Sequence, residues 1–110
     1  QKNDPRITAL EDYIITHPTE NLSHTKMCEI ADVSESTLRR LFKAKTGKTI
    51  YEYVKEVKMT NAARRLLITN EPIAAISYAL GYETPSYFSK CFREIFGVTP
   101  QEYRKTSHEV

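Results

Sequence analysis

The chain has 110 residues, of which 40% are hydrophobic and 27% are charged, and its formal net charge is +2. This composition is typical of one folded domain, or of two very small ones that share helices, and it excludes intrinsic disorder. No apolar run approaches the length of about 18 residues that spans a bilayer, and no signal-peptide pattern opens the chain. Because there is no initiator methionine, we expect the sequence to be part of a longer protein.

Local signals predict two helices at the start of the chain. Asp4 is suited to the N-cap of the first helix and Pro5 to its first position, and apolar residues recur at helical spacing until Pro18. Ser23 is suited to cap a short second helix, which ends at the break formed by Asp32 and its neighbours.

Two further helices are predicted in the middle of the chain. Ser34 is suited to cap the first of them, and Gly47 fits the left-handed position that ends it. Thr49 and Glu52 then form a capping box, which opens a long helix extending to about Thr69. The broad apolar stripe of that helix consists of Val54, Val57, Ala62, Ala63, Leu66 and Leu67.

Two more helices follow the break at residues 70–72. The first is short, covers residues 73–80 and ends at Gly81. The second begins with Thr84 as N-cap and Pro85 at its first position, and it ends at Gly97. Its apolar side consists of Phe88, Phe92, Ile95 and Phe96.

The last helix opens with a second capping box, formed by Thr99 and Glu102, and extends through Tyr103. No pair of runs shows the alternation typical of strands, so the sequence predicts an all-α fold of about seven helices.

The chain also contains an internal repeat, because a shift of 50 residues brings it partly onto itself. The matched pairs are Leu38 with Phe88, Arg40 with Lys90, Phe42 with Phe92, Lys43 with Arg93, Gly47 with Gly97, Thr49 with Thr99, Glu52 with Glu102 and Tyr53 with Tyr103. Upstream the register changes by one residue, since the loop before the second capped helix is longer. Each unit is a short helix, a turn, a capped helix and a glycine stop, which is the helix-turn-helix pattern.

This repeat predicts two helix-turn-helix subdomains joined by a long central helix. The expected segments are 1–48 for the N-terminal helix and first helix-turn-helix, 49–70 for the linker helix, and 71–110 for the second helix-turn-helix and C-terminal helix. The apolar positions of the two units match, whereas the outward faces of their capped helices differ. Such a difference is expected of a protein that reads two base sequences, although a plain helical repeat with a drifted surface also fits.

The small net charge conceals a basic middle. Residues 1–33 carry a net charge of −3, residues 34–48 carry +4 and residues 55–65 carry +3. Local density of Lys and Arg favours binding to a polyanion such as a nucleic acid, and a solvated helix face is the alternative.

The sequence resembles the DNA-binding domain of the AraC/XylS family of bacterial transcription regulators, from about residue 5 to residue 105. The residues that carry the resemblance are Ser34, Leu38, Arg40, Leu41, Phe42, Lys43 and Gly47, the segments 58–60 and 70–73, and, most specifically, Gly81, Tyr82, Ser86, Tyr87, Phe88, Ser89, Lys90, Phe92, Arg93, Phe96, Gly97, Thr99, Pro100, Tyr103 and Arg104. The departures from the family pattern are Asp32 in place of the usual first-turn Gly, Lys58 in place of a frequent Arg, Ser77 in place of Ala, and Cys91 in place of an aliphatic residue.

The resemblance implies roles for particular residues. The base-facing positions of the family correspond to Ser36, Arg39 and Arg40 in the first unit and to Ser86, Ser89 and Lys90 in the second, with Pro85 close to the bases. Lys43 and Arg93 lie one turn further on and are expected to contact phosphates, as are the N-terminal ends of the helices capped by Ser34 and Thr84.

Alternatives remain for several of these positions. Arg39 is also spaced to form an ion pair with Glu35, four residues earlier. Arg64 and Arg65 are suited either to the DNA backbone or to a solvated face. The three tyrosines Tyr78, Tyr82 and Tyr87 are expected to be packing residues.

The central helix would be roughly 30 Å long at about 1.5 Å per residue, close to the repeat of about 34 Å between major-groove faces. The expected partner is therefore double-stranded DNA, read by two recognition helices in successive major grooves. RNA polymerase is the other expected partner. We expect this domain to bind neither a membrane nor a small molecule, and any effector to bind an N-terminal domain outside this sequence. The expected location is the bacterial cytoplasm, at the nucleoid when bound to DNA. The alternative function is a helical adaptor that docks on the transcription machinery without reading DNA.

Few groups suited to catalysis or metal binding are present. Cys28 and Cys91 lie outside any CxxC motif, and the histidines His17, His24 and His108 share no ligand spacing with them. Both cysteines fall in apolar-periodic stretches, which favours buried reduced thiols. No GxSxG, HExxH, P-loop or GxGxxG motif occurs, so we expect no enzymatic activity, metal site or cofactor.

Overall fold

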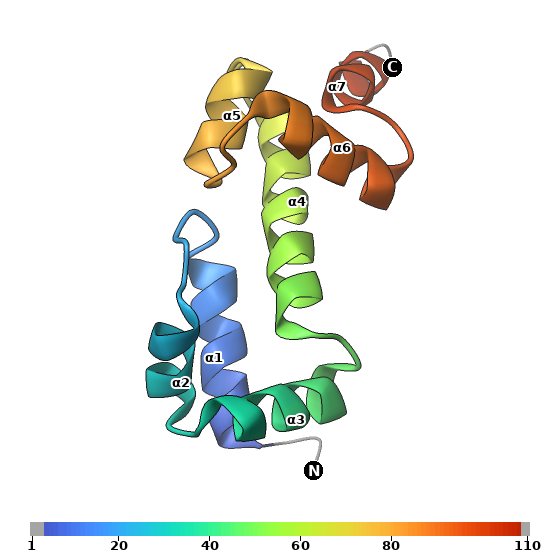
Figure 1. Ribbon diagram of the computed structural model, residues 1–110. Coiled ribbons are helices and arrows are strands. Elements are labelled where there is room, and N and C mark those ends of the chain that lie inside the picture. The colour runs from blue at the N-terminus through green and yellow to red at the C-terminus, as the bar shows by residue number, and fades with distance from the viewer. Residues whose placement is uncertain (1–3, 109–110) are drawn as a thin grey trace. The chain divides into compact units, whose positions relative to one another are not determined.

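The computed structural model describes residues 4–108, with the side chains of 107 and 108 left out. Over this range it contains seven helices and no strand, which confirms the all-α prediction (Figure 1). The helices are α1 (Pro5–Thr16), α2 (His24–Ala31), α3 (Glu35–Thr46), α4 (Ile50–Ile68), α5 (Ile73–Ala79), α6 (Pro85–Phe96) and α7 (Pro100–His108). None of them is both long and apolar enough to cross a membrane.

The helices form two compact units, residues 1–57 and 58–110, and the boundary falls inside α4. The core of the first unit is built from α1, α2 and α3. Its buried residues are Ile7, Leu10, Ile14, Met27, Ala31, Leu38 and Phe42. The first turns of α4 close this core, with the Tyr53 ring packed edge-on against Phe42 at a centroid distance of 5.2 Å.

The second unit has its own core, formed by the rest of α4 together with α5 and α6. Its buried residues are Met59, Ala62, Ala63, Leu66, Ile76, Leu80, Phe88, Cys91 and Phe92. Tyr103 of α7 packs edge-on against Phe92 at 5.4 Å, so the last helix belongs to the same core.

The predicted helix ends are confirmed by their capping bonds. The Thr49 amide donates to Glu52 Oε1 at 2.9 Å and the Glu52 amide donates to Thr49 Oγ1 at 3.1 Å. Thr99 and Glu102 repeat this reciprocal pair at 2.9 and 3.2 Å. Because these bonds satisfy amides that have no partner inside the helix, the start of α4 and of α7 is determined by local sequence.

The turns of the two helix-turn-helix motifs share one backbone conformation. Asp32 at the end of α2 has φ 58° and Gly81 after α5 has φ 88°, both left-handed. In each turn the amide of the next residue donates to a carbonyl of the last helical turn. The Val33 amide donates to the Cys28 carbonyl at 3.2 Å, and the Tyr82 amide donates to the Ser77 carbonyl at 3.0 Å. The first turn therefore keeps the geometry of the second although it lacks a glycine.

Two polar side chains in the core of the second unit are satisfied. Lys58 is 8% exposed and its ammonium donates to the Leu80 carbonyl at 2.6 Å, and desolvation lowers the pKa of this lysine below its ordinary value. Ser77 is fully buried and its hydroxyl donates to the Ala74 carbonyl at 2.8 Å. Both departures from the family pattern are thus accommodated without an unpaired polar group.

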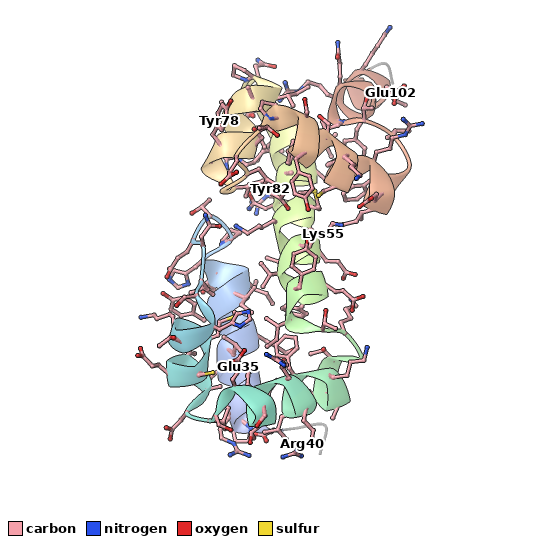
Figure 2. All side chains as sticks on the ribbon, viewed as in Figure 1. Glu35, Arg40, Lys55, Tyr78, Tyr82 and Glu102 are labelled. Atoms are coloured by element: carbon pink, nitrogen blue, oxygen red, sulfur yellow. The ribbon has the colours of Figure 1, made fainter. Side chains whose placement is uncertain are left out.

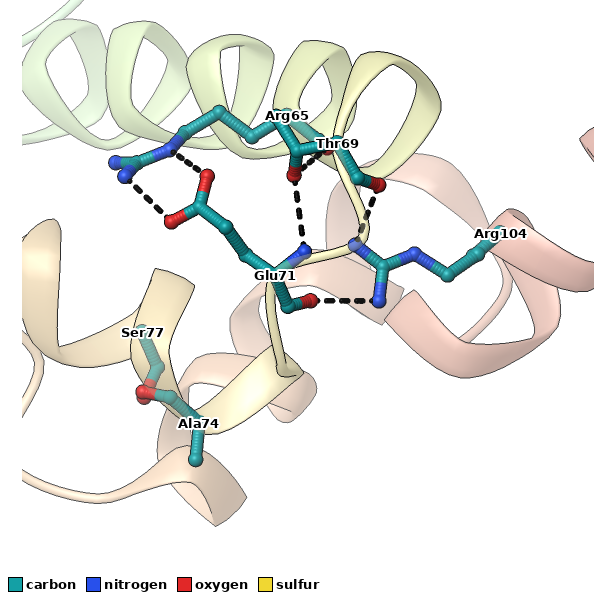
Figure 3. A network of polar contacts seen from close by, with 6 residues as sticks. All are labelled: Arg65, Thr69, Glu71, Ala74, Ser77 and Arg104. Carbon is teal, nitrogen blue, oxygen red and sulfur yellow. Dashed lines mark hydrogen bonds and ion pairs between the residues drawn. The ribbon is translucent and has the colours of Figure 1, made fainter.

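Arg104 ties α7 to the segment that joins α4 and α5. Its guanidinium donates to the carbonyls of Leu66, Glu71 and Thr69 at 3.1, 2.7 and 3.3 Å. Figure 3 shows the bonds to Glu71 and Thr69, beside the ion pair in which Arg65 donates to the Glu71 carboxylate at 2.9 Å. One cation therefore satisfies carbonyls left open where α4 ends.

Two packing expectations were wrong, those for Leu67 and Cys28. Leu67 in the predicted apolar stripe is 42% exposed, and Ile95 on the apolar side of α6 is 39% exposed. Cys91 is a buried free thiol, as expected, but Cys28 is only half-buried. All three lie at the edge of an apolar face, where helical spacing alone does not decide burial.

Replacing Asp32 by glycine is expected to raise the free energy of unfolding by about 0.5–1 kcal/mol, because relief of left-handed strain outweighs the extra entropy of unfolded glycine. Gly97→Ala is the opposite change at a left-handed position (φ 81°) with open space for a Cβ, and it should lower that free energy by about 1–2 kcal/mol. Urea unfolding followed by circular dichroism measures both, and a loss of stability in Asp32→Gly would contradict the assignment of strain.

Arg104→Ala is expected to lower the free energy of unfolding by about 2–3 kcal/mol, because three carbonyls lose a charged donor. Arg104→Lys should restore less than half, since one ammonium does not span three acceptors. Lys105→Ala, an exposed change on the same helix, is the control and should stay within about 0.5 kcal/mol of the parent chain. Equal losses in the Arg104→Ala and Lys105→Ala variants would contradict a stabilising role for the bonds from Arg104 to the three carbonyls.

Candidate nucleic-acid interface

The first candidate surface lies on α3. Leu38 and Phe42 are buried in the core of the first unit, which fixes the rotation of this helix about its axis. The positions at i, i+3, i+4 and i+7 on the opposite side form one exposed row. This row, the first recognition surface, consists of Ser36, Arg39, Arg40 and Lys43, all of them exposed.

The second candidate surface repeats this arrangement on α6, where Phe88 and Phe92 are buried in the place of Leu38 and Phe42. The second recognition surface consists of Pro85, Ser86, Ser89, Lys90 and Arg93. Ser86, Lys90 and Arg93 are exposed, and Pro85 and Ser89 are half-buried. Each unit therefore brings together the side chains that the sequence predicted for it.

The two N-cap residues are engaged in capping. Ser34 Oγ accepts from the Thr37 amide at 3.4 Å and donates to Thr37 Oγ1 at 3.0 Å. Thr84 Oγ1 accepts from the Tyr87 amide at 3.1 Å. Both residues are exposed, so the N-terminal ends of α3 and α6 face solvent.

The basic residues divide into two groups. Several that contributed to the basic middle are neutralised by ion pairs within the chain: Lys45 pairs with Glu11, Lys48 with Glu56 and Arg65 with Glu71. In contrast, the cations at Arg40, Lys43, Lys90 and Arg93 make no hydrogen bond or ion pair within residues 4–106. Each recognition surface therefore offers two such cations, while Arg64 of α4 and Lys105 of α7 are exposed elsewhere.

Arg39 is the exception on the first recognition surface. Its guanidinium donates from Nη2 to Glu35 Oε2 at 2.6 Å, which is the ion pair that the spacing offered as an alternative. His24 Nδ1 of α2 lies 3.0 Å from the same oxygen. The bonds from Arg39 and then from His24 hold the pKa of Glu35 below its ordinary value, so that it is ionised at neutral pH.

Figure 2 labels Glu35 and Arg40 on α3, and Tyr78 and Tyr82 in the second unit. Tyr82 packs edge-on against Phe88 at 5.5 Å, which confirms it as a packing residue. The same expectation was wrong for Tyr78, which is 57% exposed, whereas the ring of Tyr87, although 48% exposed, packs against that of Tyr82 at a centroid distance of 6.0 Å. The contact of His24 with Glu35 was not foreseen, because these residues are 11 positions apart on different helices and no local spacing relates them.

Nothing in the described side chains suggests metal chemistry, since no three His, Cys, Asp or Glu residues among them are grouped to hold an ion. The arrangement instead offers two exposed rows of hydrogen-bond donors, each on a helix whose other side is buried. Such rows fit the major groove, which admits an α-helix and presents base edges to it.

Comparison with known proteins decides the family. A helix-turn-helix domain model matches residues 27–106. The multiple antibiotic resistance protein MarA of Escherichia coli K12 is 32% identical over 109 residues, which cover 97% of this chain and 86% of MarA. The crystal structure of an AraC-type transcriptional regulator from Chromobacterium violaceum superposes with a TM-score of 0.88 at 29% identity, covering 94% of this chain and 92% of that one.

The chain belongs to the AraC/XylS family of DNA-binding transcription regulators. It is a sequence-specific DNA-binding regulator, and the family is not one of enzymes. The DNA-binding domain of AdpA, solved in complex with a target DNA, has the same fold, with a TM-score of 0.86 at 20% identity over 92% of this chain and 91% of that one. The resemblance stated from the motif residues is thereby confirmed. In this AraC/XylS domain, α3 and α6 occupy the places of the second helices of the two helix-turn-helix motifs.

Glu35→Gln is expected to reduce stability at pH 7 and to matter less in acid. The pKa of Glu35 in the folded state is lowered from 4.5. Its ion pair therefore stabilises the fold fully above pH 4.5, and this contribution disappears as the pH falls through the folded-state pKa. The stability difference between the parent chain and Glu35→Gln should therefore shrink between pH 7 and about pH 3.

Urea unfolding at both pH values measures this difference. Glu29→Gln removes the same charge from an exposed position on α2 without touching Arg39 or His24, and it is the control. An equal pH-dependent difference in both variants would assign the effect to net charge and not to the ion pair.

Proposed function

We propose that this domain regulates transcription by inserting α3 and α6 into the major groove of double-stranded DNA. The observation that carries this proposal is the arrangement repeated in both units. Two buried residues fix each helix, and the positions at i, i+3, i+4 and i+7 on its other side are all exposed except Ser89, which is half-buried. A domain of the same fold has been solved on its target DNA, which supports the same use here.

The chemistry of each side chain supports a division of roles. Arg39 and Arg40 carry planar guanidinium groups that can donate twice to a guanine edge, and Ser36 adds a small donor and acceptor beside them. In the second unit Ser86, Ser89 and Lys90 are less selective readers, with Pro85 next to them. We expect the second unit to tolerate a wider range of base sequences than the first.

The phosphate contacts are assigned to the ends of these rows. Lys43 and Arg93 lie one turn beyond the base-facing residues, are exposed and make no hydrogen bond or ion pair among residues 4–106, which suits a phosphate partner. Each also acts electrostatically on a capping-box carboxylate, Lys43 on Glu52 and Arg93 on Glu102. The N-terminal ends of α3 and α6, capped by Ser34 and Thr84, direct backbone amides toward phosphate oxygens.

The two motifs are proposed to occupy successive major grooves. A helix of 19 residues, the length of α4, is about 28 Å long, and major-groove faces recur about every 34 Å. Bending of the DNA by tens of degrees, which costs on the order of 1–6 kcal/mol, can adjust the spacing of the two grooves. One chain would then read two unlike half-sites without requiring a palindrome.

RNA polymerase is the proposed protein partner and the bacterial cytoplasm the proposed location, because a regulator of this family acts where transcription takes place. The second candidate function is an adaptor that docks on the transcription machinery without reading DNA. The unpaired cations at base-facing positions favour the DNA reader, since an adaptor has no need of them.

Duplex binding as a function of salt distinguishes the two functions. A DNA reader loses affinity steeply as salt rises, because each phosphate contact releases counterions, with a slope of log K against log salt of about −0.9 per contact. Fluorescence anisotropy on duplexes obtained by random-sequence selection measures this slope. Selection of no duplex at any salt would favour the adaptor.

Arg40→Ala is expected to cost about 1–3 kcal/mol of binding free energy, concentrated at one base position of the selected sequence. Arg40→Lys keeps the charge without the paired donors, so it should retain non-specific affinity while losing most of the discrimination. The measurement is Kd against a panel of single-base variants of the selected duplex. A uniform loss in Arg40→Ala across that panel would reassign Arg40 to a phosphate.

A further inference from the structure

One acidic side chain lies next to the first recognition surface, at the N-terminal end of α3. This is the end of the helix that a helix-turn-helix motif directs at the bases. Glu35 is the first residue of α3, one turn before Arg39. Its Oε2 accepts from Arg39 at 2.6 Å and lies 3.0 Å from His24 Nδ1 of α2, so the carboxylate is held from two helices. The positions that match Glu35 and Arg39 in the second unit are Pro85 and Ser89, so this arrangement belongs to the first unit alone.

This carboxylate does not help the domain to attract DNA. It lines a hollow at the α2–α3 turn together with Glu29 and Asp32, so three carboxylates gather around that hollow. Phosphates repel such charge, and the ion pair neutralises a cation that would otherwise attract them. A residue that lowers general attraction to a polyanion is expected to act on selectivity instead.

The geometry shows how the pair can read a base without breaking. A guanidinium has five N–H donors in a rigid fork, and the bond to Glu35 uses one nitrogen, Nη2. Nη2 carries a second N–H, which stays available and can pair with an N–H of a neighbouring nitrogen to reach the two acceptors of a guanine edge. A long side chain held in one orientation also loses less conformational entropy when it binds.

We propose that Glu35 is a positioning residue that aims the Arg39 guanidinium at a guanine and lowers the affinity of the domain for non-specific duplex. This inference rests on the proposed function of α3 as a base-reading helix. On non-specific DNA a phosphate must compete with Glu35 for Arg39, whereas a guanine in the right place binds Arg39 while the ion pair stays formed. His24 contributes by holding the carboxylate from α2.

The test compares Kd for a duplex selected from random sequence by the parent chain with Kd for a scrambled duplex. Glu35→Gln is expected to tighten binding to the scrambled duplex by about two- to fivefold at low salt, because one repelling charge is removed. The affinity for the selected duplex divided by the affinity for the scrambled duplex should fall about tenfold, which is within the range of discrimination that one bidentate contact provides. The loss should map to the same base position as the loss in Arg39→Ala.

Two controls separate positioning from charge and from folding. Glu29→Gln removes a carboxylate from the same hollow without touching Arg39 and should leave the affinity ratio unchanged within about twofold. In an Arg39→Ala background, Glu35→Gln should no longer change the ratio, because the residue through which it acts is absent. Circular dichroism confirms that each variant is folded at the temperature of the assay.

Each remaining outcome overturns the inference. Equal weakening on both duplexes would make Glu35 a structural residue only, and equal effects of Glu35→Gln and Glu29→Gln would make it a general charge. A ratio that still falls in the Arg39→Ala background would show that Glu35 does not act through Arg39. Failure of the parent chain to select any duplex would instead overturn the proposed function itself, before the role of Glu35 is reached.

Discussion

The rotation of two helices about their own axes is the constraint on which the rest of this domain depends. Successive residues of an α-helix are turned by about 100° about its axis. A modest change in the rotation of α3 or α6 would therefore expose the neighbouring side chains in place of its recognition surface. Burial of Leu38 and Phe42 in one unit, and of Phe88 and Phe92 in the other, prevents that error. The bulkiest apolar side chains of α3 and α6 thus determine which polar ones are offered to a partner.

Turns and helix caps that recur 49 or 50 residues apart hold the helices of the two units in the same arrangement. The left-handed residues Asp32 and Gly81 hold equivalent turns, and the capping boxes at Thr49 and Thr99 start the helix that follows each motif. Because these devices act through backbone geometry, they place no demand on the exposed faces. The two faces are therefore free to differ in chemistry while the scaffold stays the same.

This division explains what was predictable from the sequence. Caps, glycine stops and apolar spacing act within a few residues, so all seven helices and their order were predicted, with α7 longer than expected. Burial at the margin of a face depends on neighbours that are distant in sequence, and there the prediction was wrong for Leu67 and Tyr78. The candidate site behaves likewise: its helix faces were predictable from spacing, whereas the contact of His24 with Glu35 depends on how α2 and α3 pack.

The electrostatics of the domain follow from which charges the fold uses itself. A net charge of +2 gives little reason to expect attraction to DNA, yet Lys45, Lys48 and Arg65 are neutralised by partners inside their own unit. Four of the cations without such partners, Arg40, Lys43, Lys90 and Arg93, stand on two narrow helix faces, where they act within a Debye length of about 8–10 Å. Long-range attraction from so small a net charge is weak, so binding must be decided at contact distance. At that distance hydrogen-bond geometry counts for more than charge, and a recognition helix can then include a carboxylate such as Glu35 beside its arginines.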